Sequence, residues 1–204
     1  MGCGYTTEKS KSAPLKIANV STKTEPKSIE VKIVLLGNTG VGKSSIAMRF
    51  SQDKFLESHE VTIGGAYFQH QITLPNGVSV KMHIWDTGGA ERFRSMAHIY
   101  YKDAAVAILT YDITQAKSLD GVKYWMDDLE RHADRSKMVL ALAANKCDKP
   151  PEDDYVIPLG RKYAEENNML FKETSALQGK GIQELFKEIS EKVVECNMKS
   201  SSNN

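Results

Sequence analysis

The sequence predicts an α/β protein: a doubly wound sheet of about six strands, mostly parallel, with one antiparallel edge strand. Three observations support this fold class: apolar runs alternate with helical stripes, a glycine-rich loop follows the first run, and an early pair of runs flanks a tight turn. The 204 residues are enough for one domain with a buried core. We expect this domain at 29–197, between a flexible segment 1–28 and a disordered tail 198–204.

The expected strands are short apolar runs. Val31–Leu36 is continuous, which is typical of a buried parallel strand. Ala66–Leu74 and Val78–Trp85 flank an Asn-Gly turn, which predicts a β-hairpin. Further strands are expected at Ala104–Tyr111, Met138–Ala144 and Met169–Glu173.

Helical patterns occupy several connections between these runs. A helix is expected to begin near Lys43, directly after the glycine loop. Apolar residues recur at helical spacing within 119–129 and 182–193. Strands that alternate with helices imply βαβ units, and therefore a mostly parallel sheet that is covered on both faces.

Composition excludes several classes of protein. Net charge is +1 and the lysines are spread along the chain without aromatic interleaving, so no nucleic-acid partner is expected. There is no apolar run long enough for a membrane span and no secretory signal pattern. The cysteines, Cys3, Cys147 and Cys196, are widely spaced, which favours a reducing compartment without disulfides or a zinc site.

The strongest local motif is a phosphate-binding loop. GNTGVGKS at Gly37–Ser44 fits G-x-x-x-x-G-K-[ST], in which backbone N–H groups surround phosphate oxygens and the helix N-terminus faces the anion. Lys43 would neutralise the β- and γ-phosphates, and the Ser44 hydroxyl would bind Mg²⁺. The alternative is a glycine-rich turn without a ligand, but the strand before it and the helix after it favour a P-loop NTPase. The expected contacts are Thr39, Gly40, Val41, Gly42, Lys43, Ser44 and Ser45.

Two later motifs extend this site. Asp86 ends an apolar strand, the Walker-B arrangement that holds Mg²⁺, although a turn aspartate is the plain alternative. Asn145-Lys146-Cys147-Asp148 follows the strand 138–144, and ETSA follows at 173–176. The Asp148 carboxylate can accept from two donors on one edge of guanine, a donor pair that adenine lacks. Alone such a string is weak because these residues fill turns, but after a P-loop it predicts guanine recognition.

At this point the chain resembles the Ras superfamily and, within it, the Rab GTPases. The resemblance covers about Glu30 to Cys196. The early-endosomal Rab group is the nearest, through the GKSS start of the first helix and an Ile-Gly-x-Ala segment. The segments that resemble Rab signatures are Ile63–Phe68, Trp85–Phe93, Tyr100–Ala104 and Leu109–Thr114.

The resemblance implies further roles around the phosphates and the base. Thr62 matches the switch I threonine that reaches Mg²⁺ when GTP is bound, the Gly89 N–H matches a γ-phosphate contact, and Phe55 matches the aromatic that packs on guanine. Switch I and switch II would lie around 53–65 and 86–101. The residues implied at the base are Asn145, Lys146, Asp148, Ser175, Ala176 and Leu177.

The same resemblance implies a monomeric switch that binds GTP or GDP with Mg²⁺. Loss of the γ-phosphate would release Thr62 and Gly89, and both switch loops would relax. Effectors would read the two loops in the GTP state, and an exchange factor and a GTPase-activating protein would drive the cycle. The catalytic positions implied are Lys43, Thr62, Gly89 and Ala90.

Ala90 is the main departure from the family pattern. The family has glutamine there to orient the attacking water, and an alanine methyl group cannot hydrogen-bond a water. We therefore expect slow intrinsic hydrolysis and a bias toward the GTP state. Two alternatives stay open: Ala90 is an engineered substitution, or an activating protein supplies the missing glutamine. Smaller departures are Gly88 for alanine, Leu177 for lysine and His59 for an aromatic in switch I, the last also explicable as an ordinary loop histidine.

The N-terminus predicts a lipid anchor. Met1–Thr6 fits M-G-x-x-x-[ST], so Gly2 is a candidate for myristoylation and the adjacent Cys3 for palmitoylation. The usual C-terminal prenylation cysteines of Rabs are absent from this sequence, which ends in Ser-Ser-Asn-Asn. The short motif also occurs by chance. Two acyl chains would hold the protein on the cytoplasmic face of endosomal or other intracellular membranes.

Three functions therefore compete. The first is a membrane-tethered Rab-type GTPase that regulates endosomal traffic. The second is a scaffold locked in the GTP state, and only the Ala90 position separates it from the first. The third, an adenine-specific P-loop kinase or ATPase, is disfavoured by the 145–148 motif.

Overall fold

A computed structural model describes residues 1, 28–57, 61–89 and 99–202 of the chain. In these ranges one six-stranded sheet has the order β2-β3-β1-β4-β5-β6. Five strands are parallel, and the edge strand β2 is antiparallel to β3, so the predicted fold class is confirmed. The strands are β1 Ser28–Leu36, β2 Gly65–Thr73, β3 Ser79–Thr87, β4 Val106–Asp112, β5 Val139–Asn145 and β6 Leu170–Thr174.

The hairpin between β2 and β3 forms as its turn chemistry predicts. Gly77 has φ of 81°, a left-handed conformation that glycine adopts without strain. The Asn76 side chain accepts from the Val78 N–H at 3.1 Å, and the Leu74 N–H donates to the Val78 carbonyl at 2.9 Å. The alternating apolar residues of β3 are buried, as their period of two predicts.

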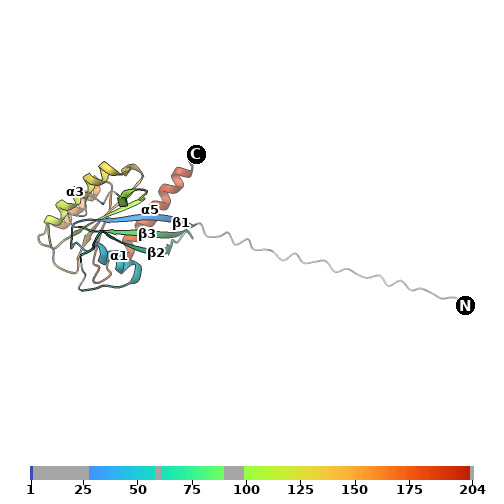
Figure 1. Cartoon of the computed structure of the whole chain (residues 1–204), viewed down its shortest axis with the longest axis horizontal. Helices are drawn as coiled ribbons and strands as arrows, with labels where there is room; N and C mark the ends of the chain where they lie inside the picture. Colours follow the sequence, from blue (N-terminus) through green and yellow to red (C-terminus); the bar gives the residue numbers. More distant parts are fainter. Residues whose placement is uncertain (2–27, 58–60, 90–98, 203–204) are drawn as a thin grey trace.

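Helices cover both faces of the sheet and separate the core into two layers (Figure 1). One layer contains apolar residues of α1 and α5, and the other contains those of α3 and α4. A helical turn, η2, leads into β5. The bounds are α1 Lys43–Gln52, α3 Lys117–His132, η2 Arg135–Lys137, α4 Val156–Glu166 and α5 Ile182–Ser202.

Helix α4 is not predicted from the sequence, because its buried stripe is sparse and it contains residues that usually break helices. The stripe is Val156, Gly160 and Ala164, at a spacing of four. Pro158 lies in the first turn, where the missing N–H has no intrahelical partner to lose. At Gly160 a Cβ atom would lie 2.2 Å from the Tyr111 hydroxyl, so a side chain there would prevent α4 from packing on β4.

The C-terminal part of the chain differs from the expected tail at 198–204. Helix α5 continues to Ser202, since no glycine or proline after Gly181 interrupts it. The segment 2–27, including the candidate lipidation residues Gly2 and Cys3, lies outside the described residues, as does 203–204. Among the described residues, no helix is both long and apolar enough to span a bilayer.

Parallel strands bring the predicted motifs to one edge of the sheet. β1 ends at Leu36 before the phosphate loop, β3 ends at Thr87 just after Asp86, and β5 ends at Asn145. β6 ends at Thr174, before Ser175. A ligand-binding crevice outside the carboxyl ends of the strands is the usual arrangement in such sheets.

Candidate functional site

A cavity of about 480 Å³ lies at this edge of the sheet. Its walls come from the phosphate loop and the start of α1, the segments after α1 and before β2, and the loops after β3, β5 and β6. Two of the expected contacts, Val41 and Ser175, are buried behind the lining. The others all line the cavity: Thr39, Gly40, Gly42, Lys43, Ser44, Ser45, Phe55, Thr62, Gly89, Asn145, Lys146, Asp148, Ala176 and Leu177.

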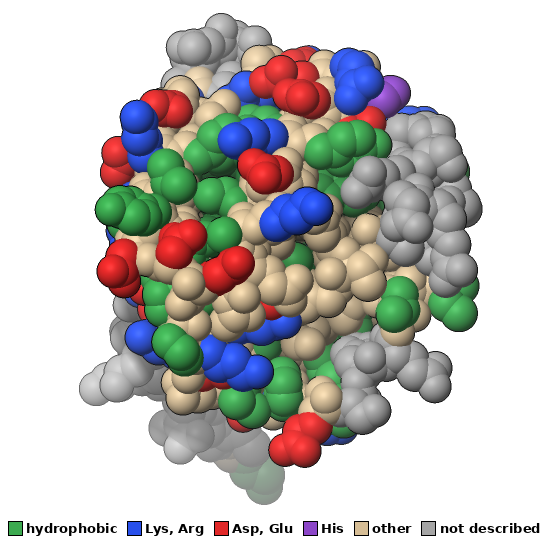
Figure 2. Space-filling view, turned by 90° about the vertical axis from the view of Figure 1, so that its left-hand side faces the viewer, with side chains coloured by type: hydrophobic (Ala, Val, Ile, Leu, Met, Phe, Trp, Pro, Cys, Tyr) green, Lys and Arg blue, Asp and Glu red, His purple; other side chains and the backbone are tan. Residues whose placement is uncertain are grey.

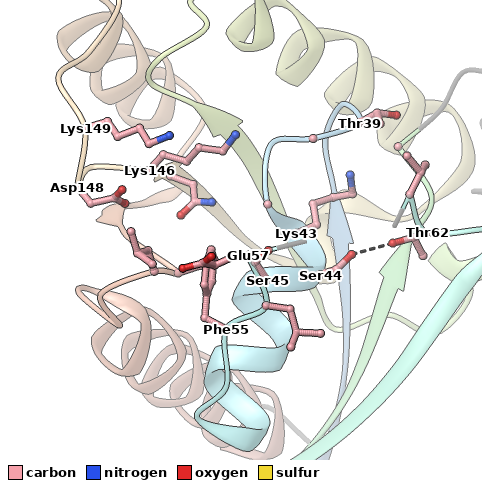
Figure 3. Close-up of a pocket in the computed structure, with 18 residues that line it drawn as sticks. Thr39, Lys43, Ser44, Ser45, Phe55, Glu57, Thr62, Lys146, Asp148 and Lys149 are labelled. Carbon is pink, nitrogen blue, oxygen red and sulfur yellow. Dashed lines mark hydrogen bonds between the residues drawn. The ribbon is translucent and has the colours of Figure 1, made fainter. Parts of the chain in front are cut away.

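Two groups of polar side chains lie at opposite ends of this cavity (Figure 3). Lys43, Ser44 and Thr62 are at one end, and Lys146, Asp148 and Lys149 are at the other. Figure 2 shows the side of the molecule toward which β1 runs, where basic and acidic side chains are interspersed. Attraction for an anionic ligand therefore depends on local groups inside the cavity, of which Lys43 is the most buried.

Lys43 is held by the phosphate loop itself. Its ammonium donates to the carbonyls of Gly37 at 2.8 Å and Asn38 at 2.9 Å, and only 5% of the residue is exposed. Burial lowers the pKa of Lys43 to about 8, and the nearby Asp86 carboxylate partly opposes that shift. A phosphate group in the cavity would stabilise the charged form.

The three residues expected at Mg²⁺ meet beside Lys43. The Ser44 hydroxyl donates to the Asp86 carboxylate at 2.5 Å and lies 2.8 Å from the Thr62 hydroxyl. The Thr62 hydroxyl is 3.4 Å from the same carboxylate oxygen. These residues come from α1, from the segment before β2, and from β3, so only the folded chain unites them. Hard oxygen donors of this kind suit Mg²⁺.

Close backbone packing requires glycine at two positions of the phosphate end. A Cβ atom on Gly89 would lie 2.5 Å from the Thr39 N and 2.6 Å from the Lys43 ammonium. A Cβ atom on Gly42, which has φ of 99°, would lie 2.3 Å from the Asn145 side chain. Gly89 therefore lies directly against the phosphate loop, where its N–H can meet a ligand.

The other end of the cavity is built around Asp148. The Ser175 hydroxyl donates to the Asp148 carboxylate at 2.5 Å and accepts from the Gln178 N–H at 3.0 Å. These bonds hold one carboxylate oxygen, so the other is available to paired donors on a base edge.

Asn145 and Lys146 tie the base end to the rest of the site. The buried Asn145 amide donates to the Val41 carbonyl at 2.8 Å and accepts from the Thr174 hydroxyl at 3.2 Å. The Lys146 ammonium lies 2.5 Å from the buried Asp112 carboxylate, and Lys146 has φ of 68°. Asn145 thus links the phosphate loop to the base end, while Lys146 is anchored on β4.

Four lining residues were not singled out from the sequence: Leu56, Glu57, Val61 and Lys149. The first three fall within the stretch expected to be switch I, so the segment was predicted but not its individual contacts. Lys149 directly follows the base motif, and adjacency is the one signal that points to it. Ala90 and His59 lie outside the described residues.

The described parts of the two expected switch stretches are joined by a backbone hydrogen bond just beyond the β2–β3 ladder, in which Gly65 pairs with Thr87. The Gly88 N–H donates to the Gly64 carbonyl at 2.9 Å, and Gly64 has φ of 73°. Thr62 lies two residues before this link and Gly89 one residue after it. A displacement of the segment that carries Thr62 would therefore also affect the position of the segment that carries Gly89.

The fold and the arrangement of the phosphate loop, Asp86 and the base-side loops define a P-loop nucleotide hydrolase of the small GTPase class. The chain belongs to the Ras family, whose model matches residues 32–195. Members of this family are GTP hydrolases.

Known relatives narrow the class to the Rab type. "Ras-related protein Rab-5B" of Plasmodium falciparum is 41% identical over 95% of this chain and 94% of its own length. "Ras-related protein Rab5" of Nicotiana tabacum is 42% identical over 81% of this chain and 82% of its own. "GTP-binding protein ypt5" of Schizosaccharomyces pombe is 43% identical over 85% and 84%. The resemblance to early-endosomal Rab proteins is therefore confirmed.

Proposed function

We propose that this chain is a GTP/GDP switch that regulates endosomal vesicle traffic from a membrane surface, with slow intrinsic hydrolysis. The observation that carries the nucleotide part is one cavity that is lined by Lys43, Ser44 and Thr62 at one end and by Asp148 at the other, with the buried Asp86 bonded to Ser44. Such a cavity suits a ligand with phosphates at one end and a base with paired donors at the other.

The phosphate end supports nucleotide binding with Mg²⁺. Lys43 would transfer its ammonium donors from backbone carbonyls to phosphate oxygens, while Ser44, Thr62 and Asp86 supply oxygens to the cation. Mg²⁺ bound there supplies positive charge that offsets the charge on the β- and γ-phosphates. Asp148, oriented by Ser175, would select guanine.

Switching would depend on Thr62 and Gly89. Both line the cavity near Lys43, and the Gly64–Gly88 hydrogen bond joins the segments that carry them. A γ-phosphate would hold both residues, and its loss would free both segments together. Effectors, an exchange factor and an activating protein would then distinguish the two states through the loops around 53–65 and 86–101.

Slow hydrolysis is proposed because Ala90 cannot orient a water. Catalysis of phosphoryl transfer rests on positioning and charge stabilisation, so a missing water-orienting side chain affects the chemical step more than nucleotide binding. An activating protein that inserts its own glutamine would restore the rate. If none does, the chain is a GTP-bound scaffold that recruits effectors without turnover.

Single-turnover hydrolysis of bound GTP tests this, with and without a Rab-type activating protein, beside Ala90→Gln. We expect Ala90→Gln to raise the intrinsic rate by about tenfold or more, in line with the usual contribution of one positioned side chain. Equal intrinsic rates in the two proteins would contradict the role assigned to Ala90. Stimulation of the unmodified chain by the activating protein would identify a cycling switch, and no stimulation would identify the scaffold.

Competition between GTP and ATP tests the base end separately. We expect GTP to displace a bound fluorescent GDP analogue at concentrations at which ATP does not, because adenine offers no donor pair to Asp148. Equal displacement by both nucleotides would favour the adenine-specific kinase or ATPase instead.

A further inference from the structure

Arg49 forms a bridge that none of the roles above uses. It lies in the last turn of α1, with 19% of its side chain exposed. Its Nε donates to the Ala176 carbonyl at 2.9 Å, and its Nη2 donates to the Leu177 carbonyl at 3.0 Å. One guanidinium therefore holds two successive peptide groups of the loop after β6, and both of these residues line the cavity.

The same side chain also holds the segment that follows α1. Arg49 Nη1 donates to the Asp53 carbonyl at 3.1 Å and to the Asp53 carboxylate at 3.0 Å. Asp53 caps α1 in a left-handed conformation with φ of 51°, which is unusual for a residue other than glycine. The chain leaves this cap toward Phe55, which lines the cavity two residues later.

Arg49 thus joins two walls of the base end. The wall at Ala176 and Leu177 and the wall at Phe55 come from segments more than 120 residues apart, and they meet through one planar group with donors in a fixed fork. Hydrogen bonds from a charged donor are stronger than neutral ones, and at 19% exposure they are only partly screened.

The hydrogen bonds from Arg49 to these carbonyls also help to position Asp148. Because a peptide unit is planar, fixing the Leu177 carbonyl fixes the direction of the following N–H of Gln178. That N–H donates to the Ser175 hydroxyl at 3.0 Å, and this hydroxyl donates to the Asp148 carboxylate at 2.5 Å. Hydrogen bonds and the planar peptide unit between Leu177 and Gln178 therefore connect Arg49 to the carboxylate of Asp148 that would face the base.

We propose that Arg49 is a positioning residue that sets how long a bound guanine nucleotide stays, by closing the two walls of the base end on each other. This inference rests on the proposed function, since it requires guanine-nucleotide binding in this cavity. Arg49 does not itself line the cavity. It acts through the loop 175–178 and through the segment 53–55.

The test is the dissociation rate of a fluorescent GDP analogue from the full chain and from Arg49→Ala, with Mg²⁺ and with a chelator. We expect Arg49→Ala, which removes four hydrogen bonds, to release the analogue about tenfold faster or more, a factor that corresponds to the net contribution of about one charge-assisted hydrogen bond. The factor should be the same with and without Mg²⁺, because Arg49 acts on the base end and the cation on the phosphate end. If Arg49→Ala merely destabilised the whole fold, its effect on the dissociation rate would not be independent of the effect of Mg²⁺.

Arg161→Ala is the matched control. Arg161 also sits beside the last strand, bonding Glu173 at 3.0 Å and lying over the Phe171 ring, but neither it nor its partners line the cavity. We expect Arg161→Ala to leave the dissociation rate of the GDP analogue unchanged. If Arg49→Ala does not fold, Arg49→Lys takes its place. An ammonium cannot span both carbonyls and Asp53, so we expect a smaller acceleration, which Arg161→Lys should not show.

The outcomes separate this inference from the proposed function. If the unmodified chain fails to retain the analogue, guanine-nucleotide binding itself is wrong. If the unmodified chain retains it and the Arg49 variant releases it at the same rate, or no faster than the Arg161 control, only the role of Arg49 is wrong. Acceleration confined to the Mg²⁺-loaded form would likewise overturn that role.

Discussion

At the scale of the residue, Lys43 is where we expect nucleotide affinity to depend on pH. Its ammonium is buried among backbone carbonyls, and burial lowers its pKa to about 8. Phosphate oxygens would favour the charged form and raise that pKa. Nucleotide binding and protonation of Lys43 are therefore coupled, so that each favours the other. We therefore expect nucleotide affinity to be highest below pH 8 and to fall as pH rises through the pKa of Lys43 in the nucleotide-free protein.

We expect the affinity for GDP to fall by about sevenfold between pH 7 and roughly pH 8.8, the loss calculated for a group of pKa about 8 that must be protonated to bind. Fluorescence titration across this range measures it. Lys43→Arg is the control, because a guanidinium stays charged throughout. A variant that still binds and keeps the same pH dependence would show that another group is responsible.

At the same scale, the sequence predicts the residues of the cavity better than the contacts between them. Each motif is local and ends a parallel strand, so strand order alone brings Lys43 and Asp148 to one edge. The Arg49 contacts span 127 and 128 residues and depend on how the loop after β6 folds. The spacing of residues in the chain carries no signal for them. Lys149 was missed for a similar reason, because only its neighbour Asp148 belongs to a motif.

At the scale of the element, apolar runs predict all six strands to within about three residues, because buried parallel strands need continuous apolar sequence. Helix α4 shows where this reasoning ends. Its small buried residues make room for the Tyr111 side chain on β4. This fit depends on tertiary packing, so the spacing of apolar residues in the sequence does not indicate the helix. The end of α5 is a second such case, because the polar composition of the last residues suits both a tail and a continuation of the helix, which extends to Ser202.

Helix α5 is held to α1 by a pair of stacked rings. The Phe50 and Phe186 ring centroids are 3.7 Å apart with an interplanar angle of 8°, and both side chains are buried. We expect Phe186→Ala to lower the free energy of unfolding by about 3–5 kcal/mol, from lost burial and the cavity that remains. Urea unfolding of the GDP-bound protein measures this.

Leu159→Ala provides the comparison for that experiment. Leu159 is a helical leucine on α4 with 55% exposure, so we expect a change within about 0.5 kcal/mol. If Phe186→Ala cost no more than Leu159→Ala, the stacked pair would not be what holds α5 in place.

At the scale of the whole molecule, the site and the chain ends lie on different sides. β1 begins at Ser28 and runs toward the phosphate loop, so the cavity lies at the far end of the strand from its start. The start of β1 and the end of α5 lie on the same side of the domain (Figure 1). The cavity therefore lies at the opposite end of the sheet from Ser28, where the segment with the proposed anchor joins the domain.

The segment before β1 suits such an anchor in sequence. The alignment with the Plasmodium Rab-5B covers 95% of the chain, so all but about ten of the 204 residues are matched, which includes part of 2–27. The relative from Nicotiana matches 81%. The alignment with the Plasmodium relative therefore begins before residue 32, where the match to the Ras family model begins.

We expect Gly2→Ala to move the protein from the membrane to the soluble fraction of cells, because it removes the site of the first acyl chain. Cys3→Ser should leave a weak, reversible association, since a single myristoyl chain gives only marginal binding and stable anchoring takes a second signal. Fractionation, with release of a fluorescent GDP analogue as the control for folding, distinguishes the two. The described domain begins 26 residues after Gly2, so both variants should release the analogue at the rate of the unmodified chain.

Gly2→Ala that stays on membranes as fully as the unmodified chain would show that the anchor lies elsewhere. Equal loss in both variants would show that the first acyl chain alone holds nothing. The graded result, complete loss for Gly2→Ala and partial loss for Cys3→Ser, follows only if the two lipids act in sequence.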